Sequence, residues 1–202
     1  KAFVLSGTNA YAAAGPLLEA ALGGARFSYV PARYDGPCCE EIAVSLAAQA
    51  REAGCDIVLA VGGGRTLDLG KMVAHYALSR YAALPTSSST CAAFTPLSVV
   101  YTPEGATITS WFFSNEVDAV VADTALLAKQ PPRCAAAGIL DSMAKWLEIK
   151  HHAPRIAEEK SPTDLFIANT LADTTYHRLL EMGQTAYRDI CAKTETDAVA
   201  EL

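Results

Sequence analysis

An apolar segment that runs directly into three glycines is the feature that most constrains the fold of this chain. Ile57–Val61 is rich in branched residues and long enough for a buried strand, and a helix-compatible segment follows Gly62–Gly64 with no intervening loop. Glycines allow a sharp turn and a close approach of bare N–H groups to an anion, and the next helix directs its positive N-terminal end to the same place. The pattern favours a pyrophosphate site, although it is neither GxGxxG nor a P-loop. A tight strand-to-helix turn without a ligand stays open as the alternative.

The composition is that of a globular protein with a substantial core. Hydrophobic residues make up 51% of the 202 positions and charged residues 19%. The formal net charge is −6 and no basic patch stands out, which argues against binding to nucleic acid or to an anionic membrane. No apolar run has the length of a membrane span, and no signal-peptide pattern is present. The six cysteines form no CxxC pair, which favours reduced thiols in a cytoplasmic protein.

Strand-like and helix-like segments alternate in the first half of the chain. Predicted strands are Ala2–Ser6, Arg26–Val30, Asp56–Val61 and Ala82–Leu84, and predicted helices are Tyr11–Leu22, Glu40–Glu52 and Leu67–Leu78. Pro16 is expected at the true first turn of its helix. This alternation predicts a doubly wound, mostly parallel α/β sheet with helices on both faces. A ligand crevice is then expected at the carboxyl ends of the strands.

The pattern changes in the second half. Ser98–Thr102 and Thr107–Phe113 flank the turn signal Pro103-Glu104-Gly105 and predict a hairpin, after which Ala119–Ala122 is expected to return to the main sheet. Helices are predicted over Arg133–His151 and Thr163–Cys191, with a polar break at Ala153–Pro162. We place a boundary near Gln130, so that residues 1–130 form a nucleotide-binding domain and residues 131–202 begin an all-helical domain. The chain lacks an initiator Met and stops in a helix-like pattern, so we expect it to be part of a longer polypeptide.

A hydroxyl-rich loop follows the strand after the glycine turn. Thr86-Ser87-Ser88-Ser89-Thr90 presents five consecutive hydroxyls that can bond phosphate or ribose oxygens. A solvated loop has the same composition. The position directly after the neighbouring strand favours a ligand, because both loops open onto one crevice.

Asp141 and Cys91 are further candidates for chemistry. Asp141 lies among small apolar residues on a helix predicted to be buried, where a carboxylate needs a partner. That partner is either Lys145 one turn on, or a divalent metal that Ala137 and Gly138 leave room to approach. His75, His151, His152 and His177 show no short metal-binding spacing. Cys91 has no identifiable base near it in the sequence, so a small buried thiol is favoured over a nucleophile.

Four ordered blocks resemble the iron-containing alcohol dehydrogenase superfamily: Val61–Lys71, Pro85–Cys91, Thr95–Tyr101 and Ala136–Trp146. The likeness is closest to the glycerol dehydrogenase branch. Within that branch, Cys91–Val99 and Ala137–Asp141 point to the hydroxycarboxylate dehydrogenase-like members. The resemblance implies a dehydroquinate synthase-like or glycerol dehydrogenase-like fold, with a divalent metal, zinc or iron, held between a nucleotide-binding domain and a helical domain.

The resemblance also implies roles for individual residues. The pyrophosphate of NAD or NADP falls on Gly62, Gly63, Gly64, Arg65, Thr66 and Asp68, and further cofactor-lining positions fall on Gly7, Thr86, Ser89, Thr95, Leu97 and Tyr101. Asp141 falls on the metal-ligating aspartate. The metal would act as a Lewis acid on the substrate oxygen while hydride passes to or from the nicotinamide.

Three departures from the family pattern matter. The two metal-binding histidines of the family lie on later helices, past Leu202. Cys91 stands where glycerol dehydrogenases carry a substrate-binding aspartate, so we expect a substrate other than glycerol. Gly7 stands where NAD-preferring members place an acidic residue, so we expect NADP(H) to be tolerated as well.

The favoured function is a metal-dependent NAD(P)(H) oxidoreductase. Its substrate is a CH–OH group or the corresponding carbonyl of a small 2-oxo or 2-hydroxy acid, an aldehyde or a polyol. The alternatives are a nucleotide-binding pseudoenzyme or truncated product without a metal site and, disfavoured by the apolar block Cys91–Val99, a dehydroquinate-synthase-like lyase. We expect a small-molecule substrate, a homo-oligomer, and no nucleic-acid or membrane partner.

Overall fold

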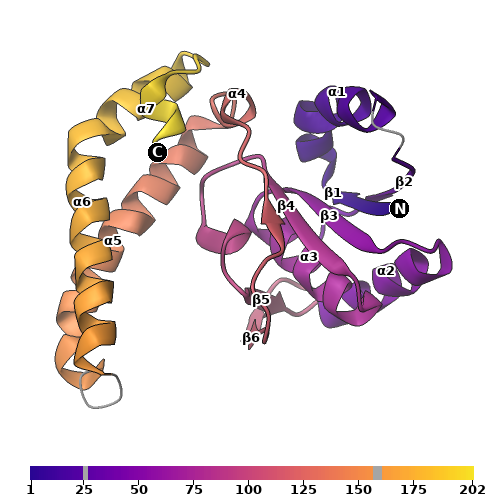
Figure 1. Ribbon diagram of the computed structural model, residues 1–202, viewed down its shortest axis with the longest axis horizontal. Helices are drawn as coiled ribbons and strands as arrows, with labels where there is room; N and C mark the ends of the chain where they lie inside the picture. The colour runs from indigo at the N-terminus through magenta and orange to yellow at the C-terminus, as the bar shows by residue number, and fades with distance from the viewer. Residues whose placement is uncertain (25–26, 157–160) are drawn as a thin grey trace. The chain divides into compact units, whose positions relative to one another are not determined.

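The computed structural model describes residues 1–24, 27–156 and 161–202 (Figure 1). These residues form two compact units, Lys1–Leu127 and Ala128–Leu202. The predicted boundary near Gln130 lies beside this division. No helix among the described residues is both long enough and apolar enough to cross a membrane.

The first unit is built on a parallel five-stranded sheet, as predicted. Its strand order is β2-β1-β3-β4-β7, and every neighbouring pair is parallel. The strands are β1 (Ala2–Ser6), β2 (Tyr29–Arg33), β3 (Ile57–Gly62), β4 (Arg80–Pro85) and β7 (Ala119–Val120). The connecting helices are α1 (Thr8–Gly24), α2 (Glu40–Glu52), α3 (Gly64–Ala77) and the short α4 (Thr124–Leu127). The return of Ala119–Val120 to the main sheet is confirmed.

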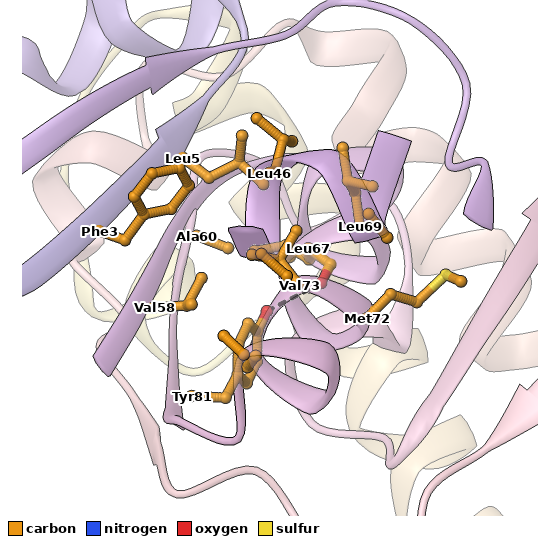
Figure 2. Packing of buried hydrophobic residues seen from close by; sticks show 14 of the residues in the cluster. Phe3, Leu5, Leu46, Val58, Ala60, Leu67, Leu69, Met72, Val73 and Tyr81 are labelled. Carbon is orange, nitrogen blue, oxygen red and sulfur yellow. Dashed lines mark hydrogen bonds between the residues drawn. The ribbon is translucent and has the colours of Figure 1, made fainter. Parts of the chain in front are cut away.

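Helices cover both faces of the sheet. Phe3 and Leu5 of β1 face α2 and α3, whereas the alternate residues Ala2 and Val4 pack toward α1 and α4. Figure 2 shows the first of these cores, in which the Tyr81 hydroxyl of β4 donates a hydrogen bond to the Leu67 carbonyl of α3 at 3.0 Å.

Gly70 lets α3 lie close against β3. A Cβ atom at Gly70 would lie 2.5 Å from the Cβ of Ala60, too close for any larger residue. This close contact fixes where α3 begins relative to the end of β3.

The strand order places a topological switch point between β1 and β3. The chain leaves β1 through α1 toward β2 on one side, and the next strand, β3, pairs on the other side of β1. The loops that leave β1 and β3 therefore diverge at the carboxyl edge of the sheet, which is where ligands bind in open α/β sheets.

A separate antiparallel hairpin follows the hydroxyl-rich loop. The short 3-10 helix η1 (Cys91–Ala93) leads into β5 (Leu97–Tyr101), which pairs with β6 (Thr107–Phe112). Gly105 in the turn has a φ of +91°, a conformation that favours glycine. The predicted hairpin is confirmed.

Two predicted elements differ from the structure. The second strand is Tyr29–Arg33 rather than Arg26–Val30, and residues 25–26 lie outside the described part of the chain. Helix α1 begins at Thr8 and runs through Pro16, so the expectation that Pro16 marks its first turn is wrong. The earlier start has a tertiary cause, because Asp35, which follows β2, accepts a hydrogen bond from the Thr8 backbone N–H at 2.8 Å.

The second unit is helical. Helices α5 (Pro132–Ile156) and α6 (Pro162–Cys191) lie side by side and α7 (Asp197–Ala200) follows, while part of the predicted break at Ala153–Pro162 lies outside the described residues. Ser161 and Asp164 form a capping box that starts α6, with Pro162 in its first turn. Trp146 of α5 stacks on Tyr176 of α6 with ring centroids 4.6 Å apart. Large apolar side chains remain exposed on the two long helices: Leu140, Leu147, Phe166, Ile167, Leu171 and Leu180.

Candidate functional site

The glycine turn joins β3 directly to α3. Gly63 is the N-cap of α3, with φ −88°, and neither Gly62 nor Gly64 has a positive φ. The three glycines are therefore needed for space rather than for left-handed backbone conformations. A Cβ atom would lie 2.7 Å from the Thr66 Cβ at Gly62 and 2.9 Å from the Thr90 Oγ1 at Gly64. At Gly63 the nearest atom, the Ser87 Oγ, is 3.3 Å away, so this residue is the least crowded of the three.

This turn can hold an anion. The first N–H groups of an α-helix have no acceptors within the helix, and the N-terminal end carries a partial positive charge. In α3 the Gly63 carbonyl accepts from the N–H groups of Thr66 and Leu67, at 3.0 and 3.1 Å. Arg65 adds an exposed guanidinium to the same turn. The arrangement suits a phosphate or pyrophosphate.

The hydroxyl-rich loop lies against the glycine turn. The Thr86 N–H donates to the Gly62 carbonyl at 3.0 Å, which ties the end of β4 to the end of β3. Two of the five hydroxyls bond within the loop, since Ser87 Oγ and Ser89 Oγ lie 3.2 Å apart. The Thr90 side chain accepts from the Ala92 N–H and caps η1. The two loops therefore open onto one crevice, as the sequence predicts.

A cavity of about 340 Å³ lies between the start of α3, the hydroxyl-rich loop and β5. It brings together many of the residues to which the sequence analysis assigned cofactor or substrate roles. Its lining includes Gly64, Arg65, Asp68, Ser89, Cys91, Thr95, Leu97 and Tyr101. Five other predicted cofactor-binding residues lie outside this lining. Gly7, Gly62, Gly63 and Thr86 lie at or directly after the ends of β1, β3 and β4, and Thr66 lies in the first turn of α3.

A buried lysine, which the sequence analysis did not single out, holds one wall of this cavity. Lys71 Nζ donates to the carbonyls of Ala92 and Thr95, at 2.9 and 3.0 Å, and also to the Leu97 carbonyl. The same ammonium lies 2.9 Å from the Asp68 carboxylate. The i, i+3 spacing of Asp68 and Lys71 was the only signal available in the sequence.

Asp68 is engaged with β5. Its carboxylate accepts from the Val99 N–H at 3.2 Å, and its backbone carbonyl accepts from the Ser98 hydroxyl at 2.8 Å. Burial raises the pKa of the Asp68 carboxyl, while the adjacent Lys71 ammonium lowers it. Two charged residues line the cavity, Arg65 and Asp68. Asp68 is paired with Lys71, whereas Arg65 forms no ion pair with another described residue.

A second feature that the sequence analysis missed lies beside Gly7. The Asp35 carboxylate accepts from the Thr8 N–H at 2.8 Å and from the Thr8 hydroxyl at 2.5 Å. These hydrogen bonds hold the pKa of the Asp35 carboxyl below its usual value. A Cβ atom at Gly7 would lie 2.9 Å from the Asp35 Oδ1. An acidic group is thus supplied beside Gly7 from the segment after β2, and tolerance for NADP(H) stays a prediction.

Asp141 lies on α5, and the expectation that it faces a buried environment is wrong. Its side chain is 50% exposed, and Lys145 Nζ lies 3.7 Å from Oδ1. Lys145 is closer to Glu148, at 2.9 Å. The described residues contain no group of three His, Cys, Asp or Glu side chains placed to hold a metal. The metal-binding role of Asp141 stays a prediction.

The cysteines are all free thiols, as predicted. Cys91 is exposed and lines the cavity, so the interpretation of it as a small buried thiol is wrong. Its backbone carbonyl accepts from the Thr95 hydroxyl at 3.2 Å. Cys91 is therefore one of the residues that surround a ligand placed in the cavity.

Comparisons with known proteins agree with this geometry. The family described as iron-containing alcohol dehydrogenase matches residues 1–127. A glycerol dehydrogenase of Thermotoga maritima is 34% identical over 170 residues, or 84% of this chain and 46% of that protein. Hydroxycarboxylate dehydrogenase A of Escherichia coli strain K12 is 35% identical over 191 residues, or 94% of this chain and 51% of that protein.

Solved structures agree with the sequence matches. The crystal structure of a probable glycerol dehydrogenase from Sinorhizobium meliloti 1021 superimposes with a TM-score of 0.79 at 29% identity, covering 98% of this chain and 54% of that one. The chain thus spans about half the length of the relatives that it matches. On the family match and these identities, the chain belongs to the iron-containing alcohol dehydrogenase family.

Proposed function

We propose that this chain is the dinucleotide-binding part of a metal-dependent NAD(P)(H) oxidoreductase. The reaction interconverts a CH–OH group and a carbonyl on a small molecule. The observation that carries the proposal is the cavity of about 340 Å³ in which the start of α3, the hydroxyl-rich loop and β5 meet. The relatives named as dehydrogenases support the reaction class.

The pyrophosphate is assigned to the glycine turn. Gly63 leaves space in front of α3, and the helix N-terminus and Arg65 supply positive charge. Thr86 and Ser89 offer hydroxyls for the phosphate or ribose oxygens. The close fit of Gly62 and Gly64 against neighbouring threonines explains those two glycines by packing, so the assignment rests on the open space at Gly63 and on the positive charge.

The nicotinamide is assigned to the cavity. Leu97 and Val99 give an apolar wall, and Thr95 and Tyr101 add hydroxyl groups that can orient the carboxamide. When bound, the nicotinamide supplies or accepts the hydride. Lys71 holds the carbonyls of the segment from Ala92 to Leu97, so this wall is fixed before any ligand arrives.

A metal site needs more ligands than the described residues bring together. The described residues offer no cluster of three ligands, so no step of the reaction is derived through the metal here. We propose that Asp141 contributes one oxygen ligand in the complete protein, and that zinc or iron is the metal. Both are divalent ions that accept a carboxylate oxygen.

The substrate is proposed to be a small 2-oxo acid or aldehyde, or the corresponding alcohol, rather than glycerol. Cys91 puts a neutral thiol in the cavity, and Lys71 neutralises the Asp68 carboxylate. Neither group presents a free negative charge that would repel an anionic substrate. A polyol would find no carboxylate acceptor at Cys91.

A titration tests the nucleotide-binding part of the proposal. Addition of the chain to NADH or NADPH should increase the nicotinamide fluorescence in a saturable way, and ADP-ribose should compete. If neither dinucleotide binds at millimolar concentration, the proposal is wrong.

Assays of NADH consumption by the complete protein distinguish the proposed oxidoreductase from the two alternative functions, a pseudoenzyme and a lyase. A pseudoenzyme would bind NADH without oxidising it in the presence of any carbonyl substrate. A lyase of the dehydroquinate-synthase type would turn over its substrate without net consumption of NADH. We also propose that the protein forms a homo-oligomer. We propose a cytoplasmic location as well, because free thiols are typical of a reducing compartment and all six cysteines are free.

A further inference from the structure

We propose that two copies of this chain associate through β6, whose free edge pairs antiparallel with the same strand of the second copy. The inference rests on the proposed homo-oligomer and names the surface that joins two of its subunits. It does not depend on the dinucleotide site.

β6 is an edge strand with an unprotected outer side. Among the described residues it pairs with β5 on one side and with no strand on the other (Figure 1). Ile108 and Phe112 are 61% and 74% exposed. Proteins commonly protect such edges with lysine, proline or inward-pointing charges. Thr107–Phe112 contains no proline and no charged residue, so its edge is able to accept a further strand.

The hydrogen bonds between β6 and its neighbour show which backbone groups point outward. The Phe113 N–H donates to the Pro96 carbonyl at 2.8 Å, and the positions paired in this way recur at every second residue back to Thr109. The residues between them, among them Ser110 and Phe112, direct their N–H and C=O groups away from β5. The Ser110 carbonyl accepts a long hydrogen bond from the Thr109 hydroxyl, at 3.4 Å, and keeps a second lone pair.

The outward residues of β6 are complementary to a second copy of themselves. A two-fold axis at Ser110 places this residue opposite its own copy, and places Phe112 opposite Ile108 of the partner. Each dimer then gains two pairs of an aromatic and a β-branched side chain, a favourable cross-strand combination. Ile108 is the extra residue of a β-bulge, because the pairing with β5 steps from Thr109 to Thr107. This register pairs residues 108–112 of both copies and forms about six backbone hydrogen bonds.

A groove beside the free edge leaves room for the added strand. It has a volume of about 960 Å³ and is lined by residues 108–112 and, on its other side, by the start of α2. Val44 of α2 lines it and is 44% exposed, so a strand placed there removes further apolar surface from water. Glu40 and Glu41 also line it. They disfavour an acidic partner, whereas a second β6 is uncharged and brings no like charges together.

Disulfide cross-linking of the complete protein tests the register. Ser110→Cys places two thiols opposite each other, with Cα atoms about 5.5 Å apart, within the range that a disulfide spans. Thr109→Cys is the matched control, because Thr109 is also exposed but its two copies would lie about 8 Å apart, too far for a disulfide. After mild oxidation, mass spectrometry of peptides should find a disulfide between the two copies of residue 110. It also distinguishes this disulfide from any formed by the exposed thiols Cys91 and Cys191.

Ser110→Pro tests the backbone hydrogen bonds. The Ser110 N–H points away from β5, so proline removes a bond to the partner without removing one inside the hairpin. Analytical ultracentrifugation of the complete protein should show that its mass falls to about half that of the wild type. Phe112→Lys should have the same effect. Leu17→Lys is its matched control, since Leu17 is 51% exposed on α1, and this variant should keep the wild-type mass.

Three results would overturn the inference. The first is no more disulfide at residue 110 in Ser110→Cys than at residue 109 in Thr109→Cys. The second is a wild-type mass in both Ser110→Pro and Phe112→Lys, which places the interface elsewhere. The third is a monomeric wild type, which leaves the edge of β6 to another segment or another protein. Circular dichroism and NADH titration of each variant show whether it is folded, and NADH binding by the wild type tests the proposed function separately from the interface.

Discussion

Lys71 Nζ lies 2.9 Å from the Asp68 Oδ1, and the two side chains are only 4% and 11% exposed. The pair joins α3 to the wall of the candidate cofactor cavity, because each partner also bonds the backbone between Ala92 and Val99. A buried ion pair has this effect only while both charges are present, since either one alone is left buried without an opposite charge.

Lys71→Met is therefore expected to destabilise the fold by about 3–5 kcal/mol, because it leaves Asp68 and several carbonyls without their donor. Urea denaturation, followed by circular dichroism, measures the free energy of unfolding. The double variant Lys71→Met, Asp68→Leu removes the unpaired charge and should lose less stability than Lys71→Met alone. If the double variant were the less stable of the two, the hydrogen bond that Asp68 accepts from the Val99 N–H would outweigh the cost of the unpaired carboxylate.

The main sheet could be predicted because its signals are local. The alternation of strands and helices and the glycine turn at Gly62–Gly64 can be seen in short windows of sequence, and the structure follows them. The crevice between the glycine turn and the hydroxyl-rich loop follows from strand order, which α/β alternation restricts strongly.

The parts that could not be predicted depend on distant contacts. Lys71 bonds carbonyls 21 to 26 residues further along the chain, and Asp35 acts on Thr8 from 27 residues away. Neither of these contacts produces a periodic pattern of residues in the sequence from which it could be predicted. Asp141 was expected to be buried because its neighbours are small and apolar, but apolar composition does not say which side of a helix is covered in the fold.

Gly63→Val is expected to abolish dinucleotide binding while the fold is kept. Among the described residues outside its own turn, the nearest atom to a Cβ at Gly63 is Ser87 Oγ at 3.3 Å, so the new side chain is expected to enter the space assigned to the pyrophosphate. Fluorescence titration with NADH measures the loss. Gly23→Val is the matched control, because a Cβ there has no other described residue within 4 Å and Gly23 lies at the end of α1. Normal NADH affinity in Gly63→Val would show that the pyrophosphate does not lie over this turn.

Cys91 should react with iodoacetamide at pH 8 and be protected by NADH. The thiol is exposed and lines the cavity assigned to the nicotinamide, so a bound cofactor should block it. Cys191 is also exposed but lies on α6, and its labelling should not respond to NADH. Burial raises the pKa of Cys38 to about 12, so this thiol should stay unmodified in the native protein. Mass spectrometry of the labelled peptides distinguishes the three sites, and equal labelling of Cys91 with and without saturating NADH would contradict the assignment.

Cys91→Asp should shift the substrate preference of the complete protein toward glycerol. A carboxylate at this residue accepts hydrogen bonds from polyol hydroxyls, each of which costs about 1–3 kcal/mol when it is buried unpaired. The same charge repels an anionic 2-oxo acid. The measurement is kcat/KM for glycerol, 2-oxobutanoate, 2-oxoglutarate and simple aldehydes, with wild type and variant side by side. Glycerol as the best substrate of the wild type would refute the interpretation of Cys91.

Asp141→Asn in the complete protein should lower metal content and turnover together. The amide keeps the size of the side chain but is a weaker ligand than a carboxylate, so a metal held in part by Asp141 should be lost during dialysis. Lys145→Gln is the control, because it removes the ammonium 3.7 Å from Asp141 without touching the proposed ligand. Metal analysis by inductively coupled plasma mass spectrometry should therefore find a full complement in Lys145→Gln and a reduced one in Asp141→Asn. If Asp141→Asn keeps both its metal and its activity, the half-exposed carboxylate does no more than pair with Lys145 on the surface of α5, and the metal must be bound entirely by other residues.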